Sequence, residues 1–129
     1  MSRIRTRGGR AAAALLAAAL LAVPPALAGE AGGEGVAVTL LLHQKMPNVP
    51  GKTMTVVAVD YQPGGFSAAH RHPDSGMVFA YAVSGAIRSQ VEGEAERVYR
   101  AGESWVEPPG AHHVVSANAS ASEPARLIA

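Results

Sequence analysis

The chain has 129 residues, of which 48% are hydrophobic, with no cysteine and a formal net charge of +1 at pH 7. This length allows one domain, and the absence of cysteine excludes disulfide bonds, thiolate chemistry and Cys-rich zinc sites. All ten acidic residues but only seven of the eleven basic ones follow position 28. That surplus of acid argues against a nucleic-acid-binding protein, which would show a basic patch.

Residues 1–28 are predicted to be a secretory signal peptide. Four arginines among the first ten residues precede an uninterrupted apolar run of thirteen residues, 11–23. Two prolines end this run, and Ala26-Leu27-Ala28 offers the small residues that signal peptidase recognises. We expect cleavage after Ala28, export to the periplasm or the medium, and no stable membrane span afterwards. The alternative is an uncleaved anchor, although thirteen apolar residues are fewer than the roughly 20 that a spanning helix needs.

The remaining chain is predicted to be a flexible lead-in, residues 29–35, followed by one β domain, residues 36–129. Glycine and proline separate short segments rich in apolar and β-branched residues, and no segment after residue 28 has helical spacing. The expected strands are residues 36–42, 53–61, 66–72, 77–83, 86–91, 97–99, 104–107 and 112–116. Short strands at intervals of about ten residues are typical of an all-β sandwich or barrel.

Two of these segments carry a further expectation. Residues 77–83 are apolar throughout, which predicts a strand covered on both faces. Residues 127–129 resemble the opening of a strand, so either the last strand is very short or the chain stops before a segment that its relatives have.

Three histidines form the candidate metal site. His70 and His72 lie two residues apart after a Pro-Gly-Gly turn, so both side chains would project from one face of an extended strand. His113 follows a second tight turn at residues 108–110. Neutral imidazole is the commonest protein nitrogen ligand, so His70, His72 and His113 are predicted to hold one divalent transition metal ion.

The spacing of these residues resembles the cupin family of small jelly-roll β-barrels. The first cupin motif has a glycine, two histidines, a glutamate and a closing glycine, and is matched here by Gly64, His70, His72 and Gly85. The second has a glycine, a proline, a glycine, a histidine and an asparagine, and is matched by Gly102, Pro108, Gly110 and His113, with Asn118 one residue late. The resemblance covers residues 53–118 and implies a single-domain cupin barrel, a fold that often pairs into homodimers.

One position departs from the first motif. The glutamate that normally binds metal should stand seven residues before Gly85, where this chain has Val78, and neither Gly76 nor Met77 offers a carboxylate. The implied ligand set is therefore three histidines. Some cupin oxygenases, among them thiol dioxygenases and a diketone-cleaving enzyme, resemble this chain in using three histidines alone. Such a set leaves Fe, Mn, Ni, Cu and Zn open as the metal.

The resemblance also implies an apolar pocket beside the ion. Val78, Ala80 and Ala82 share the parity of the missing glutamate and are expected to line the interior, whereas residues 77, 79, 81 and 83 would face another layer. Candidate polar or aromatic contacts to a ligand are Tyr61, Arg88, Gln90 and Trp105.

Three further side chains lie near the candidate site in the sequence or in the expected fold. His112 is predicted to point away from His113. His43 could reach the barrel mouth, but it is not expected to belong to the site. Glu107 is expected to be an exposed, ion-paired residue, with the orientation of an imidazole as the alternative.

The sequence therefore predicts an exported, metal-binding oxidoreductase of dioxygenase type that acts on a small organic substrate. No nucleophile or pair of carboxylates argues for hydrolysis, and no catalytic side chain is identified. One alternative is a non-catalytic module that binds a small molecule, with or without an ion, in a barrel that keeps its histidines for hydrogen bonding. Another is a structural or regulatory module that dimerises through its sheets.

Overall fold

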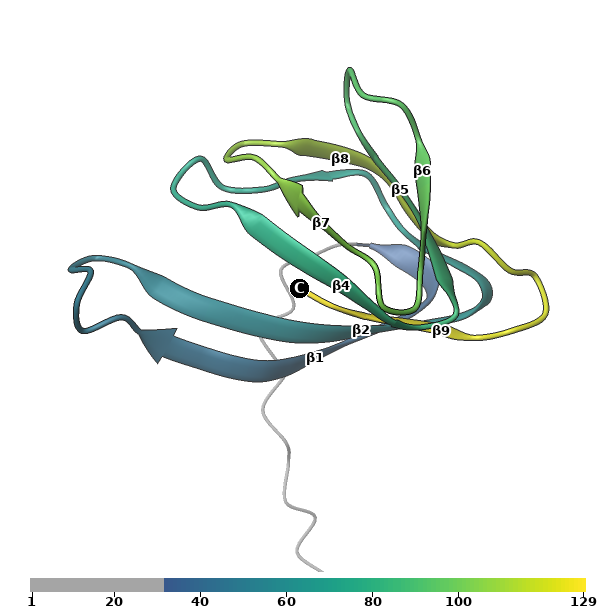
Figure 1. Cartoon of the computed structure of the whole chain (residues 1–129), viewed down its shortest axis with the longest axis horizontal. Helices are drawn as coiled ribbons and strands as arrows, with labels where there is room; N and C mark the ends of the chain where they lie inside the picture. Colours follow the sequence, from purple (N-terminus) through teal and green to yellow (C-terminus); the bar gives the residue numbers. More distant parts are fainter. Residues whose placement is uncertain (1–31) are drawn as a thin grey trace, which may run out of the picture.

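The computed structural model describes residues 32–129, so the predicted signal peptide and residues 29–31 lie outside the described part. Nine strands form one antiparallel sheet in the order β6-β5-β8-β2-β9-β4-β7, with β1 added to β2 and β3 to β8 (Figure 1). Their bounds are β1 Gly33–Lys45, β2 Thr53–Ser67, β3 His70–Arg71, β4 Val78–Ser84, β5 Ala86–Val91, β6 Arg97–Arg100, β7 Ser104–Glu107, β8 His112–Asn118 and β9 Ala125–Ile128. The sheet curls into a nearly closed barrel, and the all-β prediction is confirmed.

The first half of the chain differs from the prediction in where strands begin and end. β1 starts at Gly33, so residues 33–35 of the predicted lead-in belong to a strand. β2 runs through the expected turn at residues 63–65, where Gly64 adopts a φ of +72°. The predicted strand 66–72 is therefore divided between the end of β2 and the two-residue β3. No helix within residues 32–129 is long and apolar enough to cross a membrane.

The core lies on the inner face of the barrel. It is built from seven buried side chains, namely Tyr61, Ala80, Ala82, Ile87, Trp105, Ala125 and Leu127. β4 alternates strictly, because its alanines are buried while Phe79 and Tyr81 are exposed. The prediction that this strand is covered on both faces is wrong. No described segment covers its outer face, so the apolar side chains on that face are exposed to solvent.

The last strand closes the sheet between two neighbours. β9 has four residues and pairs antiparallel with β2 on one side and with β4 on the other. The strand expected in this last part of the chain is therefore present.

The β1–β2 hairpin reaches beyond the rest of the barrel (Figure 1). Within the described residues β1 pairs only with β2, and every residue of β1 except Val36 is exposed. Leu40, Leu41 and Leu42 are among the exposed residues.

Candidate metal centre

Strand pairing brings the three predicted histidines together. His70 lies directly opposite His113 in the antiparallel pair of β3 and β8. The backbone N–H of His72 then donates to the carbonyl of Ala111 at 2.9 Å, which continues the same pairing by one step. Each residue offers one ligand nitrogen, and these nitrogens all lie within 4.8 Å of one another. The cluster could hold a metal ion.

The imidazole of His70 is held by the backbone. Its Nδ1–H donates to the carbonyl oxygen of Ala68 at 2.9 Å, which leaves Nε2 with a free lone pair for a ligand. A ring fixed through its other nitrogen in this way is the usual arrangement of a metal-binding histidine.

The imidazole of His113 is buried and has partners on both ring nitrogens. The hydroxyl of Ser89 lies 2.9 Å from Nε2, and a carboxylate oxygen of Glu107 lies 3.3 Å from Nδ1. Burial lowers the pKa of His113, and the nearby His70 and His72 act in the same direction, while Glu107 opposes them. This histidine is therefore held in the neutral form that a metal ligand requires.

Glu107 is buried next to the histidine cluster, although the sequence predicted an exposed side chain. Its exposed fraction is 1%, and its Oε2 lies 2.8 Å from Nε2 of His72. Trp105 Nε1–H donates to Oε1 at 3.0 Å. The prediction of an exposed, ion-paired side chain is wrong because β7 turns this residue inward, next to the imidazoles.

The charge state of Glu107 follows from its neighbours. Burial alone would raise the pKa of its carboxyl group, since it disfavours the charged form. The imidazoles of His72 and His113 and the indole N–H together outweigh burial, so the pKa lies below its ordinary value. The cluster thus contains an ionised carboxylate beside imidazoles.

Two buried atoms of the cluster have no hydrogen-bond partner. They are Nε2 of His72 and Oε2 of Glu107, which lie close together without the alignment of a hydrogen bond. Buried polar atoms without a partner are uncommon in folded proteins and call for an explanation such as an ion. A divalent cation between them would satisfy both, so the residues present fit a bound metal.

The inner face beside the cluster has the predicted parity. Val78, Ala80 and Ala82 point inward, and Val78 stands directly opposite Glu107 in the pair of β4 and β7. No carboxylate occupies position 78, as the sequence indicated. Ala80 and Ala82 belong to the apolar core.

Of the other predicted contacts, only the aromatic ones lie inside. Tyr61 is buried, its hydroxyl 2.8 Å from those of Ser67 and Ser116, and Trp105 is bound to Glu107. Burial raises the pKa of Tyr61 above its ordinary value, and the two serine contacts only partly offset this. Arg88 and Gln90 alternate along β5 with the buried residues of that strand. Their side chains donate hydrogen bonds to residues of the β5–β6 turn.

The remaining histidines stand apart from the cluster. His112 points away from His113, as predicted, and its Nδ1 lies 3.3 Å from Glu92. His43 lies in the β1–β2 hairpin with its Nδ1 3.2 Å from the hydroxyl of Thr55. Asn118, which matches the second motif one residue late, donates to the carbonyls of Gln62 and Glu123 and so organises the turn before β9.

Ser89 was missed by sequence reasoning, and Glu107 was given a place beside an imidazole only as the alternative to an exposed position. The inward position of Ser89 could have been found from its two-residue spacing from Ile87, which is buried on the same strand. The inward position of Glu107 could have been found from its spacing to Trp105, had the face of that tryptophan been known.

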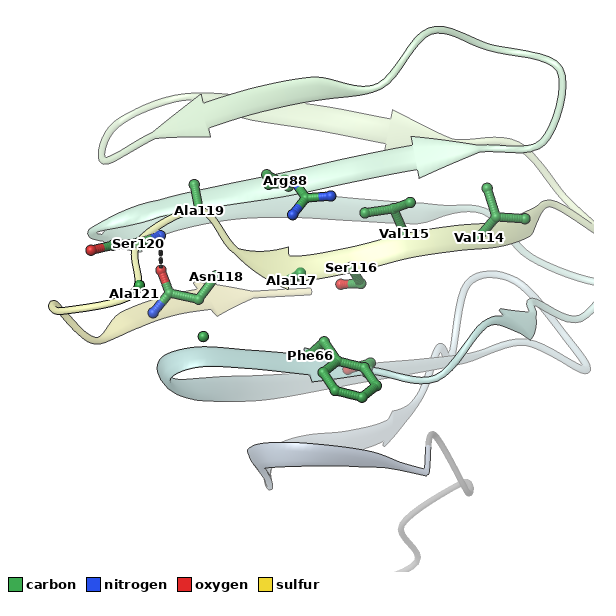
Figure 2. Close-up of a pocket in the computed structure, with 12 residues that line it drawn as sticks. Phe66, Arg88, Val114, Val115, Ser116, Ala117, Asn118, Ala119, Ser120 and Ala121 are labelled. Carbon is green, nitrogen blue, oxygen red and sulfur yellow. Dashed lines mark hydrogen bonds between the residues drawn. The ribbon is translucent and has the colours of Figure 1, made fainter.

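A surface concavity lies away from the histidines. It has a volume of about 440 Å³ and lies where β2, β8 and β5 run side by side (Figure 2). Phe66, Arg88 and Ser120 are among its lining residues, and none of the three clustered histidines is. The apolar pocket expected beside the ion is therefore not this one.

The fold and the motifs define a cupin. The cupin domain model matches residues 57–129, more than half of the chain, and the chain belongs to this family. Among curated proteins none matches the sequence.

Solved structures agree with this assignment. A cupin-like protein from Thermotoga maritima is 26% identical, with a TM-score of 0.56 over 72% of this chain and 65% of that one. Oxalate oxidase in complex with the substrate analogue glycolate is 27% identical, with a TM-score of 0.57 over 73% of this chain and 49% of that one. A predicted oxalate decarboxylase from Thermotoga maritima shares the fold at 19% identity, with a TM-score of 0.61 over 75% of this chain and 80% of that one. The chain thus spans about half of the oxalate oxidase it matches.

Proposed function

We propose that this protein holds one divalent transition metal ion between His70, His72 and His113. The observation that carries the proposal is the convergence of three imidazoles, whose ligand nitrogens lie within 4.8 Å of one another. Metal–imidazole bonds are about 2.0–2.1 Å long, so two nitrogens on opposite sides of an ion stand about 4.2 Å apart. Neighbouring nitrogens on one ion stand closer, at about 3 Å, so binding of Fe, Mn, Ni, Cu or Zn would draw the three imidazoles together.

The protein would then act as an oxidoreductase of dioxygenase type on a small organic acid. A divalent ion held by neutral imidazoles keeps positive charge and open positions, which suit an anionic, chelating substrate and O₂. The 27% identity to an oxalate oxidase that binds glycolate supports a small carboxylate as the substrate class.

Metal analysis tests the binding step. Residues 29–129 would be purified without chelator or nickel affinity resin, together with His70→Ala, His113→Ala and, as the matched control, His112→Ala. We expect about one metal ion per chain in the parent and the control and little in the other two variants, because only His112 points away from the cluster. Equal traces of metal in all four proteins would refute the site.

Oxygen consumption tests the catalytic step. The metal-loaded protein would be placed in an oxygen electrode with oxalate or glycolate, with His70→Ala beside it. Metal-dependent consumption by the parent alone supports the oxidoreductase. Tight binding of a carboxylate without turnover would instead favour the non-catalytic binding module.

We also propose that residues 1–28 direct export and are then removed. The basic start, the apolar run and the Ala-Leu-Ala site support this. Expression of the full chain in a Gram-negative host, followed by intact mass measurement, should give a protein that begins at Gly29. A cytoplasmic protein with Met1 or an intact membrane-bound chain would contradict it.

A second copy of this chain is the partner we propose for β1. Within the described residues one backbone edge of β1 is unpaired, and its exposed leucines would be costly to leave in water. An identical strand related by a two-fold axis can pair with that edge and bury Leu40 and Leu42 in a closed dimer. Light scattering during size-exclusion chromatography should show a dimer that Leu40→Lys/Leu42→Lys converts to a monomer, whereas Val98→Lys on β6 leaves it intact. A monomeric parent would refute this interface.

A further inference from the structure

We propose that Glu107 is a fourth ligand of the same ion, a carboxylate supplied by β7 rather than by β4. This inference rests on the proposed metal centre and adds to it a residue from outside the His-x-His segment. It makes the centre a site of three imidazoles and one carboxylate.

The first support is distance. Two atoms that bind one ion at about 2.1 Å, at right angles to each other, lie about 3 Å apart. Oε2 of Glu107 is 2.8 Å from Nε2 of His72, and Oε1 is 3.3 Å from Nδ1 of His113. Oε2 therefore stands from His72 at the separation expected of neighbouring ligands, while the contact with His113 is made by the other oxygen, Oε1.

The second support is the state of these atoms. At 2.8 Å a charged hydrogen bond between Oε2 and an imidazole N–H would be strong, yet the two atoms are not aligned for one. Both are buried and without a partner. A buried nitrogen and a buried oxygen that lie this close without a hydrogen bond are what two ligands of a common ion would present.

The third support is the way Glu107 is held. Trp105 Nε1–H binds Oε1 at 3.0 Å and fixes the carboxylate plane, which leaves Oε2 as the free oxygen. Within residues 32–129, the ion-pair contacts of Glu107 are with His72 and His113 only, and no lysine or arginine is among them. A carboxylate with an exposed fraction of 1% needs a positive partner, and a divalent ion at this place supplies it.

The fourth support is register. Val78 and Glu107 face each other across β4 and β7, so their Cβ atoms share one face and lie about 5 Å apart. A carboxylate on either residue reaches the same part of the interior. The carboxylate of Glu107 can thus take the position that a glutamate at residue 78 would have provided.

The test is cobalt binding by the mature chain and three variants. Glu107→Gln keeps the size of the side chain but removes its charge. Val78→Glu/Glu107→Val exchanges the two facing side chains. Glu92→Gln is the control, since Glu92 is an exposed acid beside His112. Affinity for Co(II) would be measured by competition with a chelator, and the cobalt-loaded parent would be crystallised to measure the distance from the ion to Oε2.

We expect Oε2 within about 2.3 Å of the ion, the upper end of the range for a carboxylate ligand. Glu107→Gln should weaken Co(II) binding by about 100-fold or more, the upper end of what loss of an orienting partner alone causes. The exchanged variant should regain most of that loss, and Glu92→Gln should bind as the parent does.

Two other outcomes have distinct meanings. If three imidazoles bind cobalt while Oε2 stays beyond about 3 Å, Glu107 is a positioning residue and the inference is wrong, although the metal centre stands. If the parent binds no Co(II), Mn(II), Fe(II) or Zn(II), both the inference and the proposed function are wrong. The crystal distance decides even if Glu107→Gln folds poorly.

Discussion

The glycine that closes the first motif should be essential for stability, because another segment lies against it. Gly85 has a φ of +68°, a region that costs an L-residue about 1–2 kcal/mol. A Cβ added there would lie 2.6 Å from the carbonyl oxygen of Pro124 and 2.8 Å from the Cβ of Ala125. Overpacking of this kind costs about 1–3 kcal/mol. Gly85→Ala should therefore lower the free energy of unfolding by about 2–5 kcal/mol.

Gly93→Ala is the matched control. Gly93 has a φ of +86°, but a Cβ there would meet nothing within 4 Å, so only the backbone term of about 1–2 kcal/mol applies. Urea unfolding would be followed by the fluorescence of Trp105, the only tryptophan, which is buried in the core. With a slope of about 1–3 kcal/mol per molar urea, the extra loss in Gly85→Ala is readily resolved. Equal losses in the two variants would show that the contact with the β9 segment costs nothing.

Three further outcomes are expected. Tyr61→Phe should lower the free energy of unfolding by about 1–3 kcal/mol, because it leaves the buried hydroxyls of Ser67 and Ser116 without their shared partner. Tyr81 is exposed, so Tyr81→Phe should change the free energy of unfolding by less than about 0.5 kcal/mol in the same urea assay. The metal-free protein should lose stability as the pH falls below about 6.5, because the pKa of His113 is lowered in the folded protein and the unfolded chain binds the proton more readily. It should lose more below about 4.3, because the pKa of Glu107 is lowered in the same way. A urea midpoint that stays constant from pH 8 to 4 would contradict this. Arg126→Ala should lower the free energy of unfolding by less than about 1 kcal/mol, because the ion pair with Asp60, with contacts of 2.6 and 3.0 Å, is solvent-exposed. A larger loss of thermal stability would show that the pair holds β9 in place.

The strand pattern could be predicted from the sequence because turns and alternation are local properties. Glycine and proline mark the corners, and the alternation of Ala80 and Ala82 with Phe79 and Tyr81 follows from chain geometry alone. What local patterns do not report is whether a second layer lies outside a strand. That is why the apolar run of β4 was wrongly expected to be covered on both faces. The start of β1 at Gly33 was missed because it depends on pairing with Ser67 at the distant end of β2.

The histidine cluster was predictable for the same reason, and its carboxylate was not. His70 and His72 share a face by their spacing, and a tight turn before His113 aims a third imidazole at them. The burial of Glu107 depends on the pairing of β7 with β4, whose residues lie far apart in the chain. In the sequence, an acid followed by two prolines is indistinguishable from an exposed residue at a corner.

The paired strands also limit where a carboxylate could stand near this cluster. Moving it by one residue along β4 would place it at Met77 or Phe79, whose side chains are exposed on the other face. The same parity excludes Val106 on β7. The next inward pair is Ala80 opposite Trp105, both of which belong to the apolar core, where an ionised group would be costly. Only the facing positions 78 and 107 remain on these two strands. Because this chain has valine at position 78, an inward carboxylate on β4 or β7 can stand only at position 107.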